Sequence, residues 1–145
     1  MKSTTFCFTL AFAGLLSLAA LGIGAAVDMP ATLMSRADFR AAEKALERQA
    51  RLEMANCRGE RGVEREICRA QARAQTNVRL ADLEARYHGT VAAKEDARLA
   101  RVRALYDVEK ARCRSRSAEQ RMECLREARE GRVRAVAEAR AGSPT

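Results

Sequence analysis

Apolar residues recur at intervals of three and four along most of the chain, and this spacing predicts four helices. The predicted helices cover approximately residues 35–57, 63–87, 91–114 and 118–141. Such intervals return to one face of a helix, whereas a strand alternates, and no stretch of this chain alternates. We therefore expect an all-α protein. The predicted buried faces consist of Phe39, Leu46, Ala50, Met54 and Cys57; Val63, Ile67, Ala70, Ala74, Val78, Ala81 and Ala85; Leu99, Val102, Tyr106 and Cys113; and Met122, Leu125, Ala128, Val136 and Ala139.

Capping residues mark the ends of these predicted helices. Ser35 can cap the first helix, because a serine oxygen accepts hydrogen bonds from the free N–H groups of a first turn. Gly89 suits the end of the second helix, and Thr90 can cap the third. Ser117 and Gln120 have the spacing of a capping box at the start of the fourth.

A repeated cysteine pair lies between the predicted helices. Cys57–Cys68 reads CRGERGVEREIC and Cys113–Cys124 reads CRSRSAEQRMEC, so both segments are Cys-x10-Cys. Eleven residues of straight helix separate two Cα atoms by about 16 Å, whereas a disulfide needs about 7 Å or less. A bond within either segment therefore requires the chain to turn back. Gly59 and Gly62 favour a turn in the first segment, and the Ser117 capping box favours one in the second.

A second pairing of the cysteines also fits their spacing. Residues eleven apart return to nearly the same face of a straight helix. Two antiparallel helices could then bond Cys57 to Cys124 and Cys68 to Cys113, as in the twin-cysteine helical hairpins of mitochondrial proteins. The glycines and the capping box favour bonds within each segment, but a sequence alone does not fix connectivity.

The repeat extends beyond the cysteines. Aligning residues 53–85 with 109–141 gives ten identities in 33 positions. We interpret this as the duplication of a helical hairpin, with the first hairpin at 35–89 and the second at 90–145. Many of the predicted buried positions are alanine, which buries little area, so disulfide staples would help so thin a core.

The first 26 residues read as a secretory signal peptide. Lys2 is followed by an apolar run, and Gly24-Ala25-Ala26 supplies the small residues of a cleavage site. Residues 27–34 then form a linker. Export to the periplasm, or secretion, also agrees with an even number of cysteines in the mature chain. The alternative is an uncleaved anchor in the inner membrane, because residues 6–27 are long enough to span a bilayer.

The charge balance is basic but interleaved. The chain has 27 basic and 19 acidic residues, a net charge of +8. Glutamate and arginine recur three or four residues apart, as at Glu109/Arg112 and Asp82/Arg86, which is typical of solvated helix faces. The mature chain keeps few aromatic residues for base stacking, so we expect no specific binding of nucleic acid. An anionic envelope polymer could bind at the densest local cluster, which consists of Arg112, Arg114 and Arg116.

The layout resembles a group of small exported proteins of unknown function from Gram-negative bacteria. The resemblance lies in Met34-Ser35-Arg36, in both cysteine pairs and in Glu84-Ala85-Arg86-Tyr87. It implies a signal peptide followed by two helix–Cys-x10-Cys–helix units. Members of that group usually carry a Gly-Asn-Ala-Lys-Asp-like run between their cysteines, and neither segment here has it. The resemblance implies no activity.

Few residues suggest catalysis, a metal site or a cofactor. His88 is the only histidine, and it lies beside Gly89, where a cap or surface position is expected. The chain has no nucleophile motif and no phosphate-binding glycine loop. Four thiolates could hold zinc, but structural zinc sites use shorter ligand spacings. We therefore expect a non-enzymatic protein without metal or cofactor.

The sequence leaves two functions open. The first is a structural or interaction module of the cell envelope, with an unidentified partner. The second is a small basic chaperone-like binder of unfolded exported proteins, although the Leu-Thr-x-x-Gln motif of periplasmic helical-hairpin chaperones is absent. An exposed concave apolar face would favour the chaperone, and a continuous charged surface would favour the interaction module.

Overall fold

The computed structural model describes residues 34–142, and the predicted signal peptide and almost all of the linker lie outside the described residues. The described part has no strand, which confirms the all-α prediction. Its elements are α1 (Arg36–Asn56), α2 (Gly62–His88), α3 (Val91–Arg112), the short 3-10 helix η1 (Cys113–Ser115) and α4 (Ala118–Ala141). No helix of this part is both long and apolar enough to cross a membrane.

The predicted caps form as expected. The side chains of Ser35, Thr90 and Ser117 each accept a hydrogen bond from a backbone N–H three residues further on. Gly89 ends α2 with φ of 66°, in the left-handed region that glycine enters at little cost. Gly62 also has a positive φ, of 54°, where the chain enters α2. These local choices fix the starts of α1, α3 and α4 and the end of α2.

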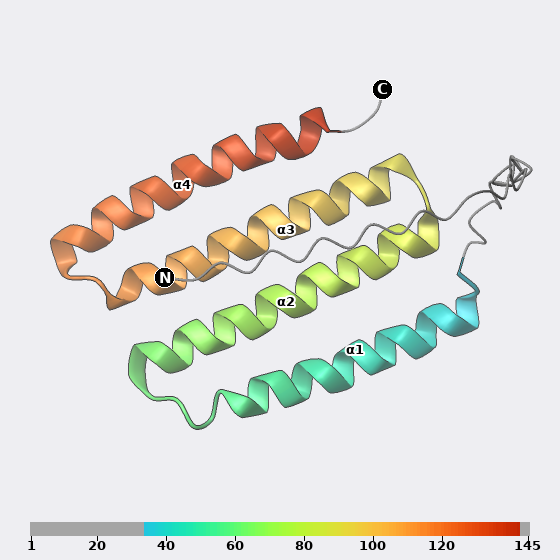
Figure 1. The fold of residues 1–145 in the computed structure, drawn as a ribbon, viewed down its shortest axis with the longest axis horizontal. Coiled ribbons are helices and arrows are strands. Elements are labelled where there is room, and N and C mark those ends of the chain that lie inside the picture. The colour runs from blue at the N-terminus through green and yellow to red at the C-terminus, as the bar shows by residue number, and fades with distance from the viewer. Residues whose placement is uncertain (1–33, 143–145) are drawn as a thin grey trace, which may run out of the picture. The chain divides into compact units, whose positions relative to one another are not determined.

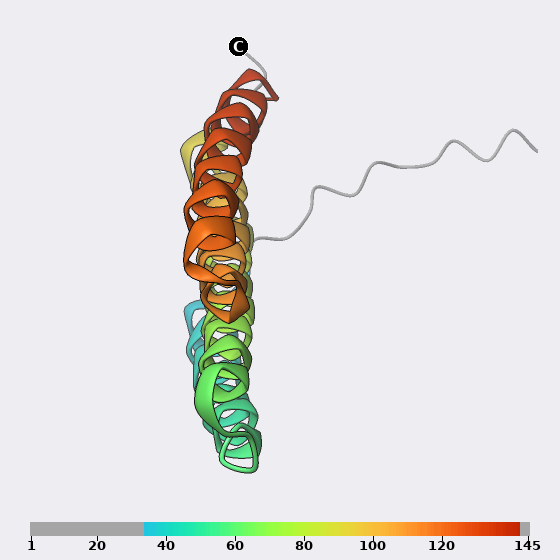
Figure 2. The same cartoon turned by 90° about the vertical axis from the view of Figure 1, so that its left-hand side faces the viewer.

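The helices of residues 34–142 lie side by side in chain order, and each runs antiparallel to the one before it (Figure 1). Seen from one end, they form a single layer (Figure 2). The extensive contacts join only consecutive helices: α1 with α2, α2 with α3, and α3 with α4. Residues 34–142 contain no second layer, so among them both faces of the layer are open.

Disulfides close both hairpins. Cys57 bonds to Cys68 and Cys113 bonds to Cys124, with Cα–Cα distances of 5.7 and 5.6 Å. The predicted stapled hairpins are therefore confirmed, and the alternative pairing between the segments is wrong. Cys57 and Cys113 are fully buried, so each staple also fills the end of a helix seam. Both stapled bends lie at the same end of the layer (Figure 1).

The core consists of narrow seams between neighbouring helices. The predicted stripes are confirmed where Ala70, Ala85 and Val102 are buried. They are incomplete because α2 and α3 each lie between two neighbours and bury two sides. The buried residues outside the predicted stripes are Ala72, Leu83, Ala97, Ala104 and Ala111. Met122 was wrongly placed in the core, since it is 65% exposed on α4, which has a neighbour on one side only.

Candidate functional site

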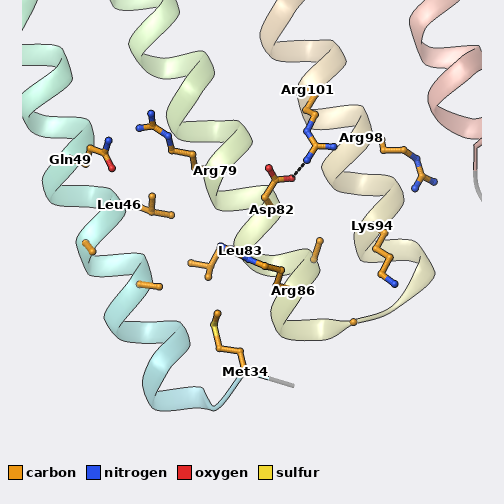
Figure 3. Close-up of a pocket in the computed structure, with 14 residues that line it drawn as sticks. Met34, Leu46, Gln49, Arg79, Asp82, Leu83, Arg86, Lys94, Arg98 and Arg101 are labelled. Carbon is orange, nitrogen blue, oxygen red and sulfur yellow. Dashed lines mark hydrogen bonds and ion pairs between the residues drawn. The ribbon is translucent and has the colours of Figure 1, made fainter. Parts of the chain in front are cut away.

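One face of the layer carries an open hollow of about 1340 Å³ over α1, α2 and α3 (Figure 3). We call it the basic hollow. It is wider and more open than the clefts that enclose small molecules, so its shape suits part of a larger partner. Its lining residues are Met34, Ala42, Ala45, Leu46, Gln49, Arg79, Asp82, Leu83, Ala85, Arg86, Gly89, Lys94, Arg98 and Arg101.

The floor of the basic hollow is apolar. Leu46 of α1 and Leu83 of α2 lie between these two helices (Figure 3), and Leu83 is 1% exposed. The other floor positions are mostly alanine, whose short side chains leave the surface low between the helices. Ala85 and Leu46 belong to the predicted stripes, whereas Ala42 and Ala45 lie outside them.

Arginine and lysine form the rim of the basic hollow. The Arg79 guanidinium lies 2.6 Å from the Glu53 carboxylate, and that of Arg101 lies 2.6 Å from Asp82. The Nε of Arg98 donates a hydrogen bond to a backbone carbonyl of α4 at 2.8 Å. These contacts hold three cations in place.

The remaining two cations of the rim have no acidic partner within residues 34–142. The sequence pairs Asp82 with Arg86 at i,i+4, but Asp82 accepts from Arg101 of the neighbouring helix instead. Among residues 34–142, neither Arg86 nor Lys94 forms an ion pair, and both side chains are exposed. Lys94 also lies in the first turn of α3, where the helix dipole is positive. Arg86 of α2 and Lys94 of α3 thus offer two unneutralised cations along the rim of the basic hollow (Figure 3).

An apolar trough continues from the basic hollow along the seam between α2 and α3. The two hollows share Arg79 and Arg101, so they form one continuous surface. The trough contains Leu105, which is 67% exposed. Its lining residues are Gln71, Ala74, Gln75, Val78, Arg79, Arg101, Ala104, Leu105, Val108, Glu109 and Arg112.

The opposite face of the same seam has a different character. Gln75 and Leu105 line the apolar trough, whereas the residues two positions further on, Asn77 and Asp107, line another hollow. Residues two apart on a helix point about 200° apart. The second hollow therefore lies on the other side of the layer. Alanine is the only apolar residue type there, and the charged residues are two acids and four bases. The lining residues are Glu66, Arg69, Ala70, Arg73, Ala74, Asn77, Asp107, Lys110, Ala111 and Arg114. The layer thus has one face with larger apolar side chains and one face whose apolar residues are all alanine.

The structure divides the predicted arginine cluster between the two faces. Arg112 lines the apolar trough and pairs with Glu109 at 2.6 Å. Arg114 lines the opposite hollow and pairs with Glu66 at 2.5 Å. Arg116 follows η1 and is exposed. Anion binding by these three arginines stays a prediction, and their closeness in sequence does not make one common surface.

Sequence reasoning missed the basic hollow because its residues come from three helices. Arg86 and Lys94 stand three and five residues from Gly89, on either side of it. A tight turn places such positions at the same end of two neighbouring helices, so the predicted stop at Gly89 was the available signal. The four cysteines considered as zinc ligands are all in disulfides, so none of them offers a thiolate to a zinc ion. His88 is exposed at the end of α2, as expected.

Comparison of the chain with protein-family models, with curated proteins and with solved structures finds no match. The resemblance to small exported proteins with two Cys-x10-Cys units therefore stays a prediction.

Proposed function

We propose that the protein is a non-catalytic interaction module of the exported compartment, and that it binds anionic partners with the face that carries the basic hollow. The observation that carries this proposal is the pair of unneutralised cations, Arg86 and Lys94, above an apolar floor. A paired cation would already be bound to a carboxylate of its own chain, and a buried one could not reach another molecule. These two are free to meet a carboxylate or phosphate of another molecule.

Two features support an exported, oxidising environment. Both Cys-x10-Cys segments form disulfides, and disulfides persist in the periplasm or outside the cell rather than in a reducing cytosol. The signal-like residues 1–26 point the same way.

The lining of the basic hollow supports binding rather than chemistry. Asp82 is its one acidic residue, and the ion pair with Arg101 holds that carboxylate. The other polar groups are cations and an amide, which bind and orient anions but do not supply a general base at neutral pH. We therefore propose a binding role and no enzymatic activity.

The sequence analysis expected an apolar face for a chaperone and a charged surface for an interaction module, but this face has both characters. The apolar trough has the character expected of a chaperone surface, and the basic hollow has that of a charge-directed interaction surface. Because both lie on one face and share residues, the proposed partner presents acidic and apolar groups together.

A pull-down with matched variants tests the proposal. The tagged protein, Arg86→Glu/Lys94→Glu and Arg69→Glu/Arg73→Glu would each be incubated with periplasmic extract at low and physiological salt. The two double variants change the net charge equally, but the second pair lies on the opposite face. We expect acidic partners to be lost only with the first variant. Equal loss with both would indicate nonspecific charge attraction and would overturn the proposal.

A further inference from the structure

The face that carries the basic hollow and the apolar trough is one of the two sides of a helical layer, and no other element of residues 34–142 covers it. Protein domains usually bury the apolar side of a layer against a second layer. Val78 and Val108 are half-buried in the trough, and Leu105 projects from it with 67% of its surface exposed. These three side chains belong to two adjacent helices, so they form one stripe over the α2–α3 seam.

The dimensions of this stripe suit a helix. From Lys94 in the basic hollow to Arg112 at the far end of the trough, α3 advances 18 residues. At 1.5 Å per residue this is about 27 Å, the length of a helix of about five turns. Helices commonly bind in apolar grooves through anchors spaced three and four residues apart.

The charges along the stripe are unequal at its two ends. At the hollow end, Arg86 and Lys94 lack an acidic partner among the described residues. At the far end, Glu109 and Arg112 neutralise one another at 2.6 Å. A complementary helix would therefore carry its acidic residues near one end and an apolar stripe along its length.

Concavity and composition distinguish this partner from a membrane or a polyanion. Leu83 is 1% exposed at the floor of the hollow, and a lipid surface cannot reach an apolar side chain that lies below the rim. A polyanion would gain nothing from Leu105 or the valines, because its affinity comes from phosphate or sulfate contacts. An amphipathic acidic segment uses both the cations and the apolar stripe.

We propose that the α2–α3 face binds an acidic amphipathic helix of a partner protein, with the acidic end in the basic hollow and the apolar stripe on Val78, Leu105 and Val108. This inference rests on the proposed function and adds the class of partner and its orientation.

Two synthetic 18-residue peptides test the inference with the disulfide-bonded protein. The first has leucines spaced three and four apart and glutamates at one end; the second has the same composition with the leucines shuffled off the stripe. We expect the striped peptide to bind at least about tenfold more tightly by fluorescence anisotropy. NMR shift changes should follow α2 and α3 from Lys94 to Arg112.

Matched variants locate the binding on the protein. Leu105→Glu should weaken binding of the striped peptide at least about tenfold, whereas Leu52→Glu should leave it unchanged. Both leucines are 67% exposed, so neither change empties the core. Arg86→Glu/Lys94→Glu should also weaken binding, and Arg69→Glu/Arg73→Glu should not. Equal binding of the two peptides, or no binding of the striped one, overturns the inference.

Anionic phosphatidylglycerol vesicles and heparin separate this inference from the proposed function. Binding of either probe that depends on Arg86 and Lys94, without striped-peptide binding, would keep the anion-binding face and overturn the helical partner. If no probe responds to Arg86→Glu/Lys94→Glu, both the inference and the proposed function are wrong.

Discussion

The guanidinium of Arg114 lies 2.5 Å from the carboxylate of Glu66, and this ion pair joins the stapled bends of the two hairpins. Arg114 belongs to η1, beside the second disulfide, and Glu66 lies two residues before Cys68 of the first. Both side chains are more than half exposed, so the pair contributes about 0–1 kcal/mol at most. The disulfides and the buried seams therefore hold this end of the layer together.

Removal of either disulfide should destabilise the fold. Each closes a loop of about 12 residues, for which chain entropy predicts roughly 2–3 kcal/mol. Cys57→Ala/Cys68→Ala and Cys113→Ala/Cys124→Ala should each lower the urea midpoint accordingly. Tryptic mapping without reductant is the control, because arginines lie between the two cysteines of each pair and trypsin therefore cuts within both segments. A peptide that joins Cys57 to Cys124 would contradict the observed pairing.

Leu83→Ala should cost about 2–5 kcal/mol of unfolding free energy, because it removes the largest fully buried side chain of the seams. Leu105→Ala removes the same atoms from a side chain that is 67% exposed and should change stability by less than about 0.5 kcal/mol. Thermal or urea unfolding followed by circular dichroism measures both. Similar losses for the two variants would mean that the seams are not the core.

Alanine at Gly89 and at Gly131 should have opposite effects. Gly89 has φ of 66°, so Gly89→Ala places a Cβ in a strained conformation and should destabilise the protein by about 1–2 kcal/mol. Gly131 lies within α4, and a Cβ there would meet only an arginine side chain at 4.0 Å. Gly131→Ala should stabilise the protein by about 0.5–1 kcal/mol. Melting temperatures of the two variants provide the measurement.

The Glu123 carboxyl should titrate below its ordinary range in the folded protein. A hydrogen bond from Arg126 is the main cause that lowers the pKa of Glu123, and the same contact raises the pKa of Arg126. A lowered folded-state pKa gives stability that is present above the ordinary value of 4.5 and is lost as pH falls through the folded pKa. In Arg126→Ala, NMR titration should show the pKa of Glu123 returning upward. An unchanged midpoint would exclude Arg126 as the cause.

The mature protein is expected to begin at Val27. Gly24-Ala25-Ala26 has the small residues of a signal-peptidase site, although these residues lie outside the described part of the chain. Intact-mass analysis of a periplasmic extract should show a chain without residues 1–26. Recovery of the full-length chain only from membranes would support the alternative anchor at residues 6–27.

The sequence predicted what local chemistry determines. The start of α4 at Ala118 follows from the Ser117 cap, and the end of α2 follows from the left-handed Gly89. The disulfide pairing followed from turn formers between the cysteines. These signals lie within a few residues of the features that they specify, so periodicity and capping were sufficient to read them.

The packing of the helices against one another was harder to predict from the sequence. One apolar stripe per helix fits an isolated hairpin, but α3 buries Val102 on one side and Ala104 on another. Alanine is so frequent in this chain that a second stripe does not stand out from the background. The basic hollow depends on the same packing, because Arg101 reaches Asp82 only when α2 and α3 are neighbours.

Each disulfide joins a cysteine to the next one along the chain: Cys57 to Cys68, then Cys113 to Cys124. A chain that enters an oxidising compartment from its N-terminus presents these cysteines in the order in which they pair. The first bond can close before Cys113 has emerged, so oxidation during translocation gives the native connectivity without later exchange. This protein should therefore mature with a thiol oxidant alone, and loss of a disulfide isomerase should leave its yield unchanged.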